Sequence, residues 1–159
     1  MAAIDHYINT IIDQGAHEAH TDGSATIEAH HLLLAIAAER GTTTHQALIS
    51  AGLDHRAIRD ALDREFEHSL NAAGVSAAFD LPRPSSAPEL PSQLGASARL
   101  ALERGFASVA RKKDLQPAHL LLGILQAEVG TVPRALALAG IDQADLKARV
   151  LRTLTNAAE

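Results

Sequence analysis

The chain has 159 residues, of which 47% are hydrophobic and 3% aromatic, so its core must be built from Leu, Ile, Val and Ala, a composition that favours helix. Its formal net charge of −5 argues against a general nucleic-acid binder, which needs a basic face. The absence of cysteine excludes disulfides, thiolate metal sites and cysteine nucleophiles.

Targeting signals are also missing from the sequence. The N-terminal stretch lacks the basic segment and following apolar run of a signal peptide. No apolar run is long enough to cross a membrane. We therefore expect a cytoplasmic protein that does not contact a membrane.

Four helices are predicted in the first part of the chain. The first carries an apolar stripe at helical spacing, formed by Ile4, Ile8, Ile11 and Ile12. The segment from Ile27 to Glu39 is apolar nearly all round, which is typical of a buried central helix. A short helix then follows Thr44 and ends at Gly52, and Asp54 caps a fourth. The stripe of the fourth helix is Ile58, Leu62, Phe66 and Leu70.

The segment from Asn71 to Leu94 has the composition of a linker. It contains four prolines, which are Pro82, Pro84, Pro88 and Pro91, together with Ser85, Ser86 and Ser92. We expect it to wrap the surface and not to separate two independent domains.

Four further helices are predicted after the linker. The first runs from about Gly95 to Ala110, with core candidates Leu100, Leu102, Phe106 and Val109. Pro117 fits the first turn of the next helix, where its missing N–H is harmless. Thr131 is predicted to cap a short helix that stops at Gly140, and Asp142 to cap the last.

The two sets of helices are an internal duplication. The run Ala29–Ile36 matches Pro117–Ile124, which places His31 and His119 88 residues apart. The same shift carries Ala51-Gly52-Leu53-Asp54 onto Ala139-Gly140-Ile141-Asp142. Because each copy is small for a core of its own, we expect the copies to pack on each other.

These motifs resemble the Clp N-terminal repeat, which occurs as a tandem pair at the front of ClpA- and ClpC-type AAA+ unfoldases. The resemblance rests on x-x-His-Leu-Leu-Leu-x-Ile followed by Ala-Gly-(Leu/Ile)-Asp, in both copies. It implies an all-α fold of two tandem four-helix repeats packed with pseudo-twofold symmetry. Repeat 1 would span residues 1–70, the linker 71–94 and repeat 2 residues 95–156.

The resemblance implies a non-catalytic module that recognises clients, adaptors or peptide-like ligands for a Clp unfoldase. The chain has no Gly-x-x-x-x-Gly-Lys-(Ser/Thr) phosphate loop, so it is not the motor, and we expect a free-standing N-domain protein without a cofactor. An alternative function is a decoy that sequesters peptide antibiotics aimed at the unfoldase. ClpC-like members carry an acidic residue before the conserved His, where this chain has His30 and Ala118, so phosphoarginine recognition is doubtful.

By resemblance, a ligand would bind where the starts of the first and fifth helices meet the loops before His31 and His119. The candidate binding residues are Met1, Ile4, Asp5, Glu28, His30, Leu94, Ser97, Gln116 and Ala118. His31, His119, Gly52 and Gly140 are assigned structural roles because the duplication repeats them.

Two further chemistries, zinc binding and hydrolysis, have weaker support in the sequence. His17, His20 and His30 could form a zinc site of a metal-responsive regulator, but no His-Glu-x-x-His pattern is present, and we expect no specific metal site. No Gly-x-Ser-x-Gly elbow is present either, so no catalytic residue is assigned.

Overall fold

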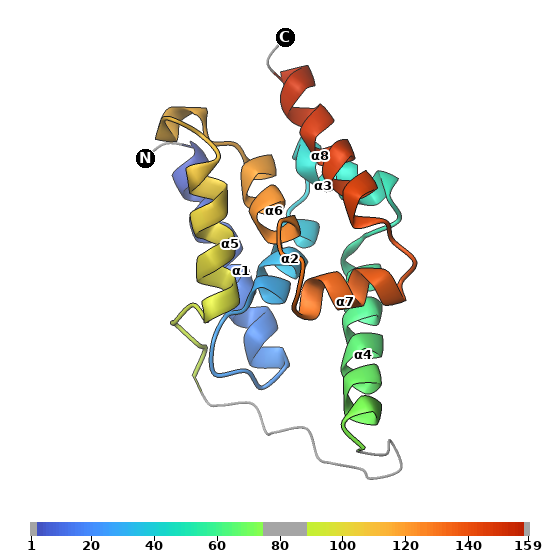
Figure 1. Ribbon diagram of the computed structural model, residues 1–159. Coiled ribbons are helices and arrows are strands. Elements are labelled where there is room, and N and C mark those ends of the chain that lie inside the picture. The colour runs from blue at the N-terminus through green and yellow to red at the C-terminus, as the bar shows by residue number, and fades with distance from the viewer. Residues whose placement is uncertain (1–2, 75–88, 158–159) are drawn as a thin grey trace.

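The computed structural model describes residues 3–74 and 89–157, which form eight α-helices, one 3-10 helix and no strand (Figure 1). The all-helical fold predicted from the sequence is confirmed. The elements are α1 (Ala3–Thr21), α2 (Ala29–Ala38), α3 (Thr43–Ser50), α4 (His55–Ala72), α5 (Ala96–Ala107), η1 (Lys112–Asp114), α6 (Pro117–Leu125), α7 (Thr131–Leu138) and α8 (Gln143–Ala157). Of the predicted linker, residues 75–88, with Pro82, Pro84 and Pro88, lie outside the described residues.

The two halves of the chain follow the same order of helices. α6, α7 and α8 each begin 88 residues after α2, α3 and α4. α3 packs against α8 while α4 packs against α7, so the halves exchange partners (Figure 1). A twofold relation between the repeats would produce this exchange, and the symmetry itself stays a prediction.

The core is centred on α2 and α6. Every residue of α2 from His31 to Ala37 is buried, as are Leu120 to Leu125 in α6. α2 contacts six other helices, which explains why it is apolar on all sides. Each fully buried Leu or Ile here contributes about 1.5–3 kcal/mol relative to an exposed one.

Most of the residues predicted to cap or end the helices do so in the structure. Asp54 Oδ1 accepts from the backbone N–H of Ala57 at 2.7 Å, and Asp142 caps α8 in the same way. Gly52 and Gly140 have φ of +78° and +75°, a conformation that side chains with a Cβ rarely adopt. The assignment of Thr131 as a cap is wrong, because Gly130 is the N-cap of α7 and Thr131 is its first residue.

Three large apolar residues assigned to the core are exposed instead. Phe66 is 63% exposed because the second half of α4 extends beyond α7 (Figure 1). Leu100 and Phe106 are each 45% exposed. The buried face of α5 consists of small residues and one leucine, which are Ala98, Ala101, Leu102 and Gly105.

Small residues let α5 and α6 cross closely. A Cβ on Gly123 would collide with the carbonyl oxygen of Ala101, and one on Gly105 would meet the carbonyl oxygen of His119 at 3.0 Å. Larger side chains on the facing surfaces would force the helices apart. The close approach therefore decides which face of α5 is buried and turns Leu100 and Phe106 outward.

A charged cluster joins α1, α2 and α4 in the first repeat. The guanidinium of Arg59 pairs with both Glu18 and Asp22, and His55 Nε2 lies 2.6 Å from Glu18 Oε1. His31 Nε2 lies 2.9 Å from Asp22 Oδ2. Burial alone would raise the pKa of Glu18 and of Asp22, but these hydrogen bonds and charges hold both pKa values below their usual range.

Replacing Gly123 with Ala should destabilise the protein by about 1–3 kcal/mol, although Ala is the better helix former by about 1 kcal/mol. The reason is the collision between the new Cβ and the Ala101 carbonyl. Denaturant unfolding measures the change, and Gly105→Ala should have a smaller effect. A Gly123→Ala protein as stable as the wild type would contradict the close crossing of α5 and α6.

Replacing Arg59 with Met should lower the free energy of unfolding by about 2–3 kcal/mol at neutral pH, because the buried Glu18 and the partly exposed Asp22 lose their cation. The matched control is Lys147→Met, the equivalent position in the second repeat, where the shifted positions of Glu18 and Asp22 are Phe106 and Ala110. We expect that control to change stability by less than about 0.5 kcal/mol.

The difference between wild type and Arg59→Met should also depend on pH. A carboxylate with a lowered pKa stabilises the fold above its ordinary pKa and loses this contribution as the pH falls through its lowered value. The difference in free energy of unfolding between the two proteins should therefore become smaller once the pH falls below the ordinary pKa values, which are 4.5 for Glu18 and 3.8 for Asp22. Urea unfolding between pH 7 and pH 3 measures it, and a constant gap would argue against this role of the cluster.

Candidate functional site

A groove of about 330 Å³ lies where the start of α2, the outer side of α5 and the connection from α6 to α7 meet. Its walls come from both repeats. The apolar part of the lining includes Leu100, Ala101, Ile124, Ala127, Val129, Val132 and Pro133. The polar part includes Glu28, His30, Ser97, Arg104, Glu128 and Arg134.

Backbone pairing before α2 and α5 positions one end of the groove. The Ile27 N–H donates to the Gln93 carbonyl at 2.9 Å, and the Gly95 N–H donates to the Ile27 carbonyl at 2.8 Å. This isolated parallel bridge between Ile27 and Leu94 brings the N-termini of the two helices together. Leu94, a candidate binding residue, is therefore half-buried beside the core and does not line the groove.

Glu28 joins the two helix N-termini. Its carboxylate accepts hydrogen bonds from the hydroxyls of Thr26 and Ser97, both at 2.8 Å. The Ser97 hydroxyl in turn accepts from the Ala29 N–H at 2.9 Å. The carboxylate lies over Gly95, where any Cβ would collide with it. Burial raises the pKa of Glu28, but these hydrogen bonds outweigh it and the pKa is lowered, so the groove contains a carboxylate at neutral pH.

His30 contributes a neutral imidazole to the groove. Burial, together with the neighbouring His31, lowers its pKa from 6.5 to about 4. The two rings lie 4.1 Å apart between centroids. At neutral pH His30 therefore offers one donor and one acceptor without adding charge.

His31 has a different environment, in which both ring nitrogens are used. Nδ1 accepts from the Glu28 N–H at 2.9 Å, so Nε2 carries the hydrogen that reaches Asp22. His119 makes the same bond to the Gln116 N–H, also at 2.9 Å. Each histidine satisfies the backbone N–H at the N-cap of its helix, which is one of the groups that a helix leaves unpaired.

Among the described residues, Asp22, His30 and His31 have potential ligand atoms that all lie within 4.8 Å of one another. This group differs from the one considered in the sequence, since it contains His30 but neither His17 nor His20. His31 and Asp22 are already bonded to each other, and Asp22 also pairs with Arg59. The group is therefore a structural network, and we propose no metal site there.

The sequence-predicted binding residues fall into two sets. Glu28, His30 and Ser97 lie together in the groove. The others do not line the groove: Ile4 packs against the core, and Asp5 pairs with Lys112 of η1 at 2.6 Å. Gln116 caps α6, and Met1 lies outside the described residues. Ala118 is only 2% exposed, so it does not present a surface to a ligand.

Apart from Ser97, the part of the groove contributed by the second repeat was not predicted from the sequence. Leu100 and Val129 are exposed there, Val129 at 85%, and Arg104 and Arg134 are its cations. Arg134 pairs with the buried Glu65 at 3.0 Å. No local motif marks these residues, because they line the groove only when α5 and α7 are packed on the first repeat.

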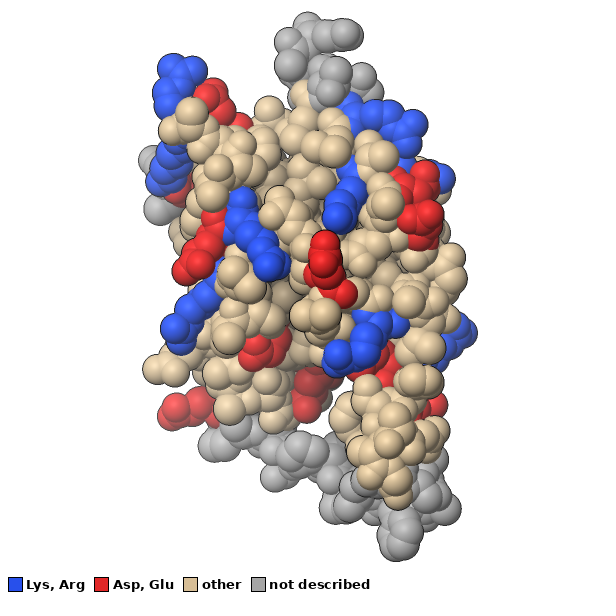
Figure 2. Space-filling view, viewed as in Figure 1, with Lys and Arg blue, Asp and Glu red and all other residues tan. Residues whose placement is uncertain are grey.

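A second cavity, of about 480 Å³, lies between α3 and α8. Its lining is about equally polar and apolar, and none of the predicted binding residues belongs to it. The lining residues are Thr43, Gln46, Ala47, Ser50, Arg149, Arg152 and Thr153. In the face shown in Figure 2, acidic and basic side chains are interspersed and do not form a patch of one sign. The apolar groove is therefore the better candidate for binding a ligand.

None of the helices in the described part of the chain is long and apolar enough to cross a membrane.

The lowered pKa of His30 predicts a pH dependence of stability. A histidine with a lowered pKa takes up its proton in the unfolded state first, so stability should fall as the pH drops from 6.5 to about 4, by at most about 3 kcal/mol. His30→Gln should flatten this part of the curve, as measured by urea unfolding. The control is His17→Gln on the exposed side of α1, and an equal flattening in that variant would contradict the assignment.

No curated protein matches the chain. A family model described as the Clp repeat N-terminal domain matches residues 4–85, which is more than half of the 159 residues. The family is a non-catalytic N-terminal domain of the Clp system. The chain belongs to the Clp repeat N-terminal domain family.

Proposed function

We propose that this protein is a peptide-binding module of the cytoplasmic Clp unfoldase system, and that it recognises clients, adaptors or peptide-like ligands through the groove between its two repeats. Family membership supports the association with the unfoldase. The observation that carries the proposal is the groove itself, an apolar channel with a few polar groups at an interface between packed units.

The chemistry of the groove suits a peptide. Exposed Leu100 and Val129 give apolar area whose burial by a ligand is favourable, at about 25 cal/mol per Å². His30 and the groups around Glu28 supply hydrogen-bond donors and acceptors for a backbone. A volume of about 330 Å³ accommodates a few side chains, so it suits a short segment and not a folded domain.

The groove should be tested with a double variant, Leu100→Ser and Val129→Ser. Both side chains are exposed, so the variant should fold. We expect it to weaken binding by about tenfold or more, because hot spots of an interface are few and apolar. Calorimetry or anisotropy against a ClpC-type unfoldase, an adaptor and an unfolded client polypeptide measures the change.

The matched control is Phe66→Ser, which removes an exposed apolar residue on α4, outside the groove. It should bind like the wild type. Equal affinity of the groove variant and the wild type for every partner would reject the groove. Binding of peptide antibiotics alone, lost in the double variant, would instead favour the decoy function.

A further inference from the structure

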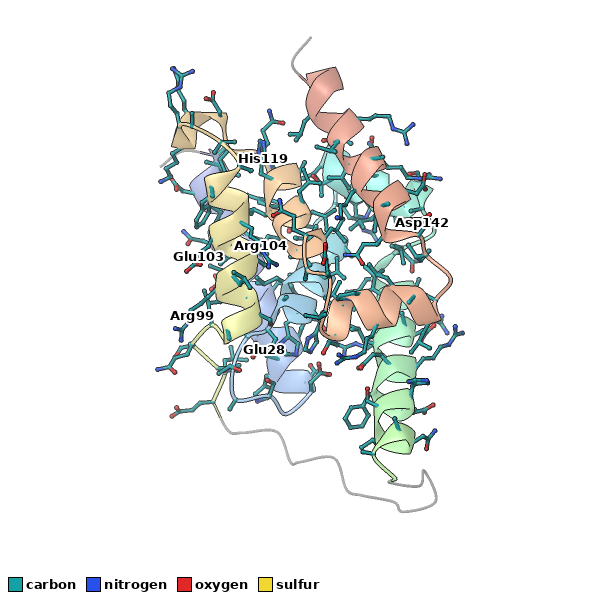
Figure 3. All side chains as sticks on the ribbon, in the orientation of Figure 1. Glu28, Arg99, Glu103, Arg104, His119 and Asp142 are labelled. Atoms are coloured by element: carbon teal, nitrogen blue, oxygen red, sulfur yellow. The ribbon has the colours of Figure 1, made fainter. Side chains whose placement is uncertain are left out.

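Arg104 is a cation in the lining of the groove that forms no ion pair with another described residue. It is half-buried, and no hydrogen bond or ion pair joins it to another described residue. The other cations nearby are engaged: Arg134 pairs with Glu65, and Arg99 Nε donates to the Leu94 carbonyl at 3.0 Å. In Figure 3 Arg104 points from α5 toward α6, whereas Arg99 and Glu103 point to the opposite side of the helix.

An unpaired guanidinium in a partly desolvated groove favours an anionic ligand group. Its planar set of N–H donors matches a carboxylate in a bidentate arrangement. The low polarity of the neighbouring walls strengthens such a pair relative to one in open water. Here these walls are Leu100, Ala101 and Ile124.

The remaining charges limit how much negative charge the groove accepts. Glu28 is ionised at neutral pH and Glu128 also lines the groove, while His30 is neutral. A phosphate dianion would meet two carboxylates and one free cation, which is unfavourable. A single carboxylate carried by an apolar segment fits this balance better.

We propose that the groove recognises an acidic side chain of a peptide, flanked by aliphatic residues, with its carboxylate bound by Arg104 and its neighbours packed on Leu100, Val129 and Pro133. This inference rests on the proposed peptide-binding function. The position equivalent to Arg104 in the first repeat is Ala16. The first repeat therefore lacks an equivalent of this arginine, and we expect one peptide bound per chain.

The test uses the full chain and two peptides blocked at both ends, acetyl-Leu-Val-Glu-Val-Leu-amide and the same sequence with Gln in place of Glu. Calorimetry should show a stoichiometry of one and about tenfold tighter binding of the Glu peptide. In Arg104→Gln the preference should vanish while the affinity for the Gln peptide is kept. Arg104→Lys should restore part of the preference.

Arg99→Gln is the control on the same helix, outside the groove, and it should keep the full preference. A third peptide, acetyl-Leu-Val-Val-Leu with a free C-terminal carboxylate, separates the two sources of a carboxylate. Tighter binding of this peptide than of the Glu peptide would overturn the proposal in favour of chain-end recognition. A preference for Glu that survives in Arg104→Gln would also overturn it.

Failure of this inference is distinguishable from failure of the proposed function. If neither blocked peptide binds the wild type, the acidic specificity is wrong. Binding of an unfoldase, adaptor or client that depends on Leu100 and Val129 would then still support the groove. Thermal unfolding of Arg104→Gln verifies that the variant folds, so that a lost preference reports recognition.

Discussion

Two helices that are apolar on nearly every side, α2 and α6, set the conditions that the rest of the fold must satisfy. Such a helix needs cover all round, and the three other helices of one repeat do not provide it. α2 is therefore covered by helices of both repeats, from α1 and α3 to α5, α6 and α7. The same burial accounts for the need for two copies, because one copy is too small to enclose its own central helix.

The two copies have diverged in how they hold that shared scaffold. The first repeat ties α1, α2 and α4 together with the carboxylates of Glu18 and Asp22 around Arg59. The second brings α5 and α6 into close contact through Gly105 and Gly123. Both keep one feature, a histidine whose Nδ1 accepts the N-cap N–H of the central helix. This bond satisfies a local need of the helix and so is independent of the neighbours that differ.

The differences between the two repeats determine the shape and the charges of the groove. Glu28 and Ser97 join the two repeats at one end, and the close approach of α5 to α6 turns Leu100 outward along the wall. His30 occupies the position before the central histidine, where resemblance suggested an acidic residue. The imidazole there is neutral at neutral pH, so this position adds no negative charge to the groove, and Arg104 lies farther along α5.

The sequence by itself determined the duplication, the order of the helices and most of their ends. These depend on local chemistry: Asp54 and Asp142 bond to N–H groups of their own helix, and Gly52 and Gly140 adopt a backbone that other residues avoid. Through the family resemblance it also predicted Glu28, His30 and Ser97 as candidate binding residues, and all three line the groove. Only the tertiary structure decided the far wall of the groove and the exposure of Leu100, Phe66 and Phe106. Which face of a helix is buried depends on the helix packed against it, and that neighbour is distant in the sequence.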